Sequence, residues 1–568
     1  MGAEMKGHCI GPMPVQEFLE EFLPTSEIPD LPALTFKSGT FDSTICVRNE
    51  VQAYEPFIAT IQSFGPALSF VDTSNSQDTN ISSTFSFTVK PDINVYADGT
   101  SHGCNVSTTE VIIKFKWDAI HDAFCDPPLH SDVGRFSFIN QTIKGMDTLG
   151  QITSYTAAQL GTQYHPHIFL VLSMQNFACI IRWDMEGAIV TCTFDYNKYP
   201  HLANFFRRFS QASPALCGVN TSVTPTSSEE AIRTRLRLII PAPVPHGLSP
   251  VGHRTRACPA FDPIHDKIVM FKDFWRVALP DILPEGVTYK LLKDTNVHNV
   301  MTCIACHDVP SLPQQRMQTL KFANASWVCH HEPLTLALNL VGKPLIQFMS
   351  SCQVVEAVSD ALIVHDNACN KAGVLHRDIS VGNVVIHGVV GILIDWDLAK
   401  LHSIQGPRQI TCTLYFCARF CVTKGTWQFM SANLVENKHS THTIEDDLEY
   451  SFYVIFWVAL MYTESYMTTL TRSLLIEEVF EAEEIEGIGS NTKSAFLISR
   501  WQITGDVFVG RKALDRLIFA LAELFALRYI LMADEEQDVF DQTFPCLELT
   551  RSHAKIIAIY NEYLTMNT

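Results

Sequence analysis

One stretch, Val374 to Lys400, constrains this chain more than any other. It holds the triplet 376–378 (His-Arg-Asp), then Asn383, then Asp395 directly after the apolar run 391–394. The apolar run is short, so it predicts a buried strand, and a second short run directly after Asn383 predicts another. The triplet and Asn383 therefore precede one strand, and Asp395 ends the next. We expect the side chains of the triplet, Asn383 and Asp395 to lie close together at one edge of these two strands.

Asp378, Asn383 and Asp395 are residues that suit phosphoryl transfer. This reaction needs a group that orients the incoming hydroxyl and accepts its proton, and it needs ligands for metal ions that bridge the phosphates. Asp378 is the candidate base. Asn383 and Asp395 offer the hard oxygen donors that Mg²⁺ prefers. The alternative is a chance tripeptide in a turn, which leaves the order of the other residues unexplained.

These motifs resemble the catalytic loop of protein kinases and the metal-binding aspartate that follows it. The wording His-Arg-Asp-Ile-Ser-x-Gly-Asn with Asp-Trp-Asp-Leu-Ala is similar to the fungal-type protein kinase family, and so are 425–432 and 446–449. The resemblance covers nearly the whole chain. It implies ATP and Mg²⁺ as cofactors and the serine or threonine hydroxyls of a protein as substrate. It also implies a catalytic role for Arg377 and a structural one for His376.

The residues expected to hold the nucleotide precede this stretch. Lys272 ends an alternating strand where the phosphate-gripping lysine belongs, and Glu285 opens the helix whose glutamate pairs with that lysine. The alternatives are an exposed strand lysine and a first-turn glutamate favoured by the helix dipole. Gly252 is the one glycine retained where the family has a Gly-rich loop, so the phosphate cradle is weakened. Leu340 ends the strand before the expected hinge, where adenine would bind.

The region after Asp395 departs from the family pattern. Residues 410–424 are apolar, with three cysteines, and separate two motifs that are usually close. We interpret them as an atypical insertion, of the kind that a retained intron would produce. Asn433 replaces the glutamate that typically pairs with an arginine of the C-lobe, and the resemblance implies that Asp447 anchors the catalytic-loop backbone. The weak Gly-rich loop and the insertion leave open a nucleotide-binding pseudokinase scaffold.

Composition favours an intracellular globular protein. The net charge of −19 argues against strong nucleic-acid binding. The 17 cysteines form no framework, which is typical of a reducing compartment. The sequence shows neither a secretory signal nor an apolar run long enough to span a membrane. We therefore expect a cytoplasmic or nuclear location; 303–307 matches a c-type haem motif, but haem is not expected.

Residues 41–212 predict an α/β domain. The order of helix, strand with Pro-Asp, strand with lysine, helix and strands resembles the PD-(D/E)XK nuclease fold. Asp92 and Lys116 match the aspartate and lysine of that pattern, but Lys114 stands where an acidic ligand is needed. A cation cannot ligate Mg²⁺. We therefore expect an inactive domain and keep a metal-dependent nuclease as the least favoured function.

The predicted fold class is α+β, a bilobal kinase-like fold preceded by the α/β nuclease-like domain. The boundaries expected are a lead-in helix at 1–40, the α/β domain at 41–212, a linker at 213–244, the kinase N-lobe at 245–345 and the C-lobe at 346–568.

Overall fold

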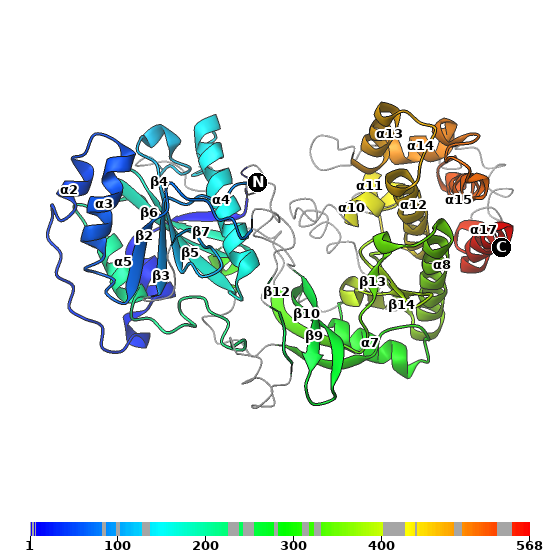
Figure 1. Cartoon of the computed structure of the whole chain (residues 1–568), viewed down its shortest axis with the longest axis horizontal. Helices are drawn as coiled ribbons and strands as arrows, with labels where there is room; N and C mark the ends of the chain where they lie inside the picture. Colours follow the sequence, from blue (N-terminus) through cyan, green and yellow to red (C-terminus); the bar gives the residue numbers. More distant parts are fainter. Residues whose placement is uncertain are drawn as a thin grey trace.

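The computed structural model shows an N-terminal domain built on one large sheet and a remainder built of a small sheet and a group of helices (Figure 1). This is the α+β class that the sequence predicts. The structure describes residues 2, 5, 7–81, 87–97, 103–127, 137–224, 238–241, 243, 255–277, 282–308, 317–322, 331–401, 426–437, 440–481, 491–530 and 548–567.

An eight-stranded sheet forms the N-terminal domain. Seven of its strands follow the order β1-β7-β6-β5-β4-β3-β2, and β8 pairs with β6. Most neighbours are antiparallel, whereas β1 with β7 and β4 with β5 are parallel. The strands are β1 (Cys9–Met13), β2 (Leu68–Asp72), β3 (Ile93–Ala97), β4 (Val111–Phe115), β5 (His167–Ser173), β6 (Phe177–Asp184), β7 (Gly187–Thr191) and β8 (Phe194–Asp195).

Helices cover both faces of this sheet, so its central strands are apolar on both sides. Val111, Ile113 and Phe115 point to one core and Ile112 to the other, as the two-residue period of a strand requires. The first core includes side chains of α1 (Val15–Phe22), α3 (Glu50–Ile61) and α5 (His201–Phe209). The second includes side chains of the long α4 (Ile143–Thr162).

Several N-terminal elements differ from the sequence prediction. The lead-in at 1–40 is part of the domain, because β1 pairs with β7 and α1 lies in the core. The strand expected at 85–96 is described only from Ile93. Residues 213–218, expected to begin a linker, pack on the sheet, where Leu216 and Cys217 are buried. Short, locally ambiguous segments such as β1 are fixed here by their long-range partners.

The nuclease-like positions contain a closed ion pair. Lys114 Nζ lies 2.9 Å from Asp92 Oδ1 and 2.8 Å from Asp92 Oδ2, and both residues are buried. The amide of Phe115 also donates to Asp92, at 2.7 Å. The ammonium of Lys114 thus neutralises the carboxylate that a metal ion would need. The likeness to a nuclease fold stays a prediction.

The small sheet of the second half follows the order β11-β12-β10-β9, with every neighbour antiparallel. Its strands are β9 (Arg256–Asp262), β10 (Lys267–Val277), β11 (Cys303–Asp308) and β12 (His331–Leu338), and α7 (Glu285–Asp294) packs beside β11. Ile239, in the predicted extended segment, forms a bridge with Phe261 of β9.

The helical part surrounds α12 (Ile444–Tyr462), most of whose residues are buried. Among the described residues, no helix is long and apolar enough to cross a membrane. Short strands carry the site loops: β13 (Lys343–Pro344), β14 (Val374–Leu375), β15 (Val384–His387), β16 (Val390–Leu393) and β17 (Lys400–Leu401). The other main helices are α8 (Ser351–Asn367), α11 (Ala432–Glu436), α13 (Thr469–Ile476), α14 (Thr492–Ser499), α15 (Lys512–Ile530) and α17 (His553–Asn567).

Buried polar contacts join the two halves. Asp184, at the end of β6, accepts hydrogen bonds from Arg182 at 2.6 Å, from the amide of Gln318 at 2.9 Å and from the hydroxyl of Thr319 at 2.8 Å. Arg256 of β9 donates to the carbonyl of Leu160 at 2.7 Å, in the last turn of α4. A cation at a helix C-terminus is favoured by the helix dipole.

We expect Asp184→Ala to lower the urea midpoint of unfolding. The change removes a buried carboxylate shared by Arg182, Gln318 and Thr319, and losing one partner of a buried ion pair costs about 3–5 kcal/mol. The control is Asp506→Ala, at an exposed carboxylate, where a surface change is expected to cost less than about 0.5 kcal/mol. Equal midpoints for both variants would contradict this account of the interface.

Candidate active site

Lys272 joins three elements at one point. Its position on β10 directs the side chain inward, where its ammonium lies 2.6 Å from Glu285 Oε2 on α7 and 2.5 Å from Asp395 Oδ1 after β16. Lys272 and Glu285 are almost fully buried, at 5% and 1% exposure. The structure therefore brings together the predicted pair and adds Asp395 to it.

The turn after β16 is shaped by Asp395 and Trp396. Asp395 has a φ of 67°, which is uncommon for a residue with a side chain. The amide of Trp396 donates to Glu285 Oε1 at 3.2 Å, so both oxygens of that carboxylate have a partner. The Trp396 ring is buried and packs edge-on against His376, with ring centroids 4.6 Å apart. These contacts hold Asp395 against Lys272.

Asp378 and Asn383 are held together on the loop between β14 and β15. The Asn383 amide donates to Asp378 Oδ2 at 2.8 Å and to the Asp378 carbonyl at 2.9 Å. His376 Nε2 lies 2.9 Å from the carbonyl of Ile394, and His376 Nδ1 accepts from the amide of Asp378 at 3.2 Å. His376 therefore connects this loop to the turn that carries Asp395.

Burial keeps His376 neutral, which its two contacts require. Burial lowers the pKa of His376 to about 4, against the opposing effect of Asp447. The neutral ring can donate through Nε2 to Ile394 and accept at Nδ1 from the amide of Asp378.

Asp447 holds the backbone of Arg377. Asp447 Oδ2 accepts from the amide of Arg377 at 2.9 Å, and Asp447 is fully buried at the start of α12. Arg377 has a φ of 73°, an uncommon conformation that needs support from its surroundings. The carboxylate supplies that support by binding the amide.

The charges around Lys272 are unequal. Asp395, Glu285 and Asp397 all act on this one ammonium. Burial would raise the pKa of Asp395, but Lys272 outweighs that effect and lowers it overall. Burial and the neighbouring Asp395 raise the pKa of Asp397 well above its usual range. More carboxyl groups are present than one lysine neutralises, so a further cation fits here.

This donor set suits Mg²⁺. Asn383 has an amide oxygen and Asp395 a carboxylate, and Asp397 stands beside Asp395. All are hard oxygen donors, which is the chemistry that Mg²⁺ selects. The residues present therefore fit the predicted ion.

Of three further predicted features, one lies within the described residues. Leu340 is half-buried between β12 and β13 and packs on the core shared by both lobes, where a hinge is expected. Gly252 and the insertion 410–424 lie outside the described residues.

A buried arginine secures the segment after the insertion, at a place the sequence analysis missed. Arg528 of α15 lies 2.8 Å from Asp446 Oδ1 and 2.5 Å from Glu449 Oε2, both on α12. The same carboxylates accept from Ser431 at 2.6 Å and from the amide of Ala432 at 2.9 Å. The chain leading into α11 is therefore held through α12.

This arrangement explains why the site does not need a glutamate at the position of Asn433. The side chain of Asn433 does not pair with the arginine but contacts Ser440 at 2.8 Å. Asp446 and Glu449 meet Arg528 instead. An arginine on an amphipathic helix resembles a surface residue in sequence. The signal that could have found it was the group of acidic residues that opens a mainly apolar helix.

The lysine–glutamate–aspartate contact, with the paired Asp378 and Asn383 on the adjacent loop, defines a site of the protein-kinase class. The family comparison agrees, because residues 328–459 match the model of the fungal protein kinase family. That part of the chain, which includes the loop, Asp395 and Asp447, is similar to the fungal protein kinase family, and this similarity supports phosphotransfer of the kinase type. No curated protein matches the chain.

We expect Arg528→Met to lower the melting temperature by several degrees. Removing the cation leaves Asp446 and Glu449 buried together, at a cost of about 3–5 kcal/mol. Arg551→Met is the matched control, because Arg551 is 64% exposed and pairs with Glu445 at the surface, where a pair contributes at most about 1 kcal/mol. A decrease in melting temperature no larger than that of Arg551→Met would show that the buried cluster is not needed for stability.

Proposed function

We propose that this protein is a kinase that uses ATP and Mg²⁺ to phosphorylate serine or threonine hydroxyls of a protein. The observation that carries the proposal is the ammonium of Lys272 between Glu285 and Asp395. Through these two contacts, Lys272 connects the small sheet, α7 and the turn next to the catalytic loop. A buried cation with access to an excess of carboxyl groups is suited to binding metal-complexed phosphates.

Each side chain has a defined task in this proposal. Lys272 neutralises phosphate oxygens, and Glu285 keeps it in place with both carboxylate oxygens occupied. Asp378, turned by the Asn383 amide, orients the incoming hydroxyl and accepts its proton. Asn383 and Asp395 would hold Mg²⁺, which when bound neutralises charge on the phosphates. Leu340 would contact the adenine.

The catalytic loop is held in position by contacts within the protein. Asp378 is tied to Asn383, His376 and, through Arg377, to Asp447. A fixed base avoids the cost of ordering during the reaction. Arg377 contributes by its backbone position and by a guanidinium contact to the carbonyl of Leu398 at 3.5 Å, beyond Asp395.

The hydroxyl type is the finer part of the proposal. Most serine/threonine kinases have a lysine two residues after the base, where this chain has Ser380, which is buried. The family resemblance favours serine and threonine. Phosphoamino-acid analysis of a labelled generic protein substrate tests it, and labelled tyrosine alone would contradict it.

ATP with Mg²⁺ should raise the melting temperature, and Lys272→Met should lose most of that shift. A ligand at about 100 times its Kd stabilises the folded state by about 2.7 kcal/mol. Lys267→Met, on the same strand but away from Glu285 and Asp395, is the control and should keep the shift. If the unmodified protein shows no shift, the pseudokinase scaffold replaces the kinase as the favoured function.

Asp378→Asn should lower phosphoryl transfer by about 10²–10⁴-fold, because a general base contributes that much. The ATP-induced thermal shift should persist, since Lys272, Glu285 and Asp395 are unchanged. Transfer is measured with labelled ATP and a generic protein substrate, with Asp506→Asn as the exposed control. Equal labelling by both variants would refute the assignment of Asp378.

A further inference from the structure

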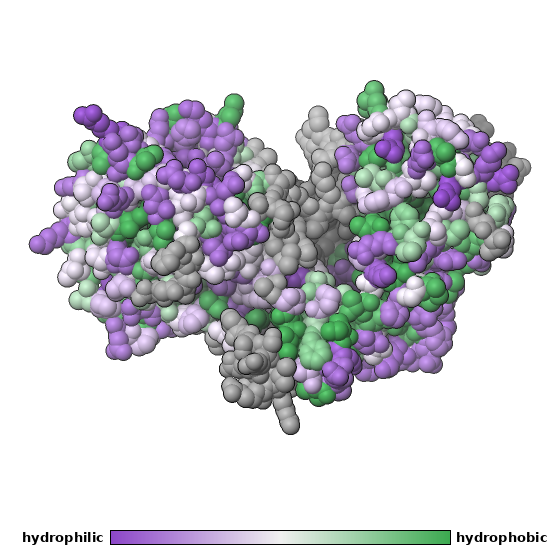
Figure 2. All heavy atoms as spheres, in the orientation of Figure 1, coloured by the Kyte–Doolittle hydropathy of each residue, from purple (hydrophilic) through white to green (hydrophobic). Residues whose placement is uncertain are grey.

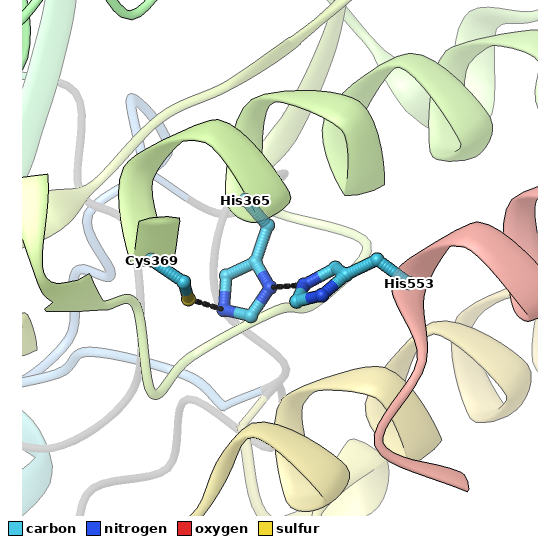
Figure 3. Close-up of side chains that lie close together, drawn as sticks. All are labelled: His365, Cys369 and His553. Carbon is cyan, nitrogen blue, oxygen red and sulfur yellow. Dashed lines mark hydrogen bonds between the residues drawn. The ribbon is translucent and has the colours of Figure 1, made fainter. Parts of the chain in front are cut away.

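A cluster of buried side chains lies behind the catalytic loop. Figure 3 shows His365 of α8 between Cys369, one turn further on, and His553 of α17. His365 Nδ1 lies 2.8 Å from His553 Nε2, and Cys369 Sγ lies 3.7 Å from His365 Nε2. All three side chains are buried. The proposed roles of the catalytic residues make no use of this cluster.

The cluster continues to the catalytic loop without a gap. His365 Nε2 lies 2.9 Å from Asp447 Oδ2, the same oxygen that accepts from the amide of Arg377 at 2.9 Å. The other oxygen, Asp447 Oδ1, lies 2.7 Å from His442 Nε2. At the far end, His553 Nδ1 lies 3.2 Å from Asp366 Oδ1. Three successive contacts therefore connect α17 to the residue before Asp378.

The protonation states complete this chain. Burial opposes the charge on His365, but Cys369 and Asp447 outweigh it and raise its pKa to about 10. Burial and then His365 lower the pKa of His553 to about 3. Near neutral pH, His365 donates through both nitrogens, to Asp447 and to His553. The neutral His553 accepts at Nε2 and donates through Nδ1 to Asp366, so each nitrogen has a suitable partner.

We propose that His553 is a positioning residue: by accepting from His365, it fixes Asp447 and hence the left-handed Arg377 that precedes the catalytic Asp378. This inference rests on the proposed function. The C-terminal helix thereby becomes part of the support of the active site. It extends the link from Asp447 to Arg377 outward to an element more than a hundred residues away in sequence.

Other contacts dock α17 independently of His553. Tyr563 donates to Ser351 at 3.2 Å, Tyr560 donates to Ser451 at 3.2 Å, and Ile556 is fully buried in the core. A change at His553 can therefore break the chain while the helix stays in place. This separates a positioning role from a purely structural one.

A pair of amide variants separates the two nitrogens of His553. Gln places its amide near the position of Nε2 and can still accept from His365. Asn is shorter, so its amide is near Nδ1 and reaches Asp366 but not His365. Tyr563→Phe is the control, because it removes one hydrogen bond between α17 and α8 outside the chain.

The first readout is amide hydrogen exchange of the catalytic-loop peptide in the full chain, which needs no activity. We expect His553→Asn to lose protection at Arg377 by about tenfold, a typical effect along a coupled network. His553→Gln and Tyr563→Phe should keep it. Equal protection in the Asn and Gln variants would overturn the proposal. An inactive protein that shows the expected exchange would refute the proposed function and leave the positioning role standing.

The second readout is the pH profile of kcat. Without its acceptor, the charged His365 is less favoured and its pKa falls, so the alkaline limb of kcat should move to lower pH in His553→Asn, with the KM for ATP unchanged. An unshifted profile would contradict the coupling. The groups that face His365 are Cys369, His376, His442, Asp447 and His553, with Asp366 behind His553.

The alternative to a hydrogen-bonded chain is a zinc site, because the three potential ligand atoms lie within 4.8 Å of one another. After dialysis against a chelator, the protein should retain no equimolar zinc. Retained zinc that is lost in Cys369→Ser would show a metal site in place of the hydrogen-bonded chain and overturn the proposal. In Figure 3, His365 stands between the other two, which suits a chain better than a shared centre.

Discussion

The contact of Lys272 with Glu285 and Asp395 is the interaction on which the site depends. An ammonium is costly to bury unless its partners are close, and two carboxylates within 2.6 Å supply them. The three residues come from β10, from α7 and from the turn after β16, so the contact fixes the small sheet against the helical part. Moving any of these elements would leave charge buried without its partner.

A second set of buried charges supports the helical half. Asp446, Asp447 and Glu449 lie in the first turns of α12, where the helix dipole and the capping box at Thr443 favour negative charge. Asp447 holds the loop between β14 and β15, whereas Asp446 and Glu449 hold Arg528 and the segment entering α11. One helix end thus positions both the loop and that segment, while its apolar remainder lies in the core. Figure 2 shows that some hydrophobic residues, in green, also reach the surface of this half.

Features that depend on the local spacing of residues could be predicted from the sequence. Features that depend on packing between segments far apart in the chain could not. Asp378, Asn383 and Asp395 were found because their spacing, with two apolar runs, is itself the signal. Arg528 and His553 carry no local signal: each acquires its partner only when helices far apart in sequence meet. The same applies to β1, a five-residue strand that is too short for its own sequence to fix its structure until it pairs with β7.

Two buried lysines show why one region favours a cation and another does not. Lys114 meets the single carboxylate of Asp92, so the pair is neutral and closed. Lys272 faces two carboxylates, those of Glu285 and Asp395, so negative charge remains for a metal ion. The N-terminal domain also constrains Lys272, through the pairing of β9 with β10. Arg256, held by the end of α4, pairs in register with Asp273, and the adjacent pair is Ala257 with Lys272. Since neighbouring residues of a strand cannot move separately, this docking also limits where the Lys272 ammonium can lie.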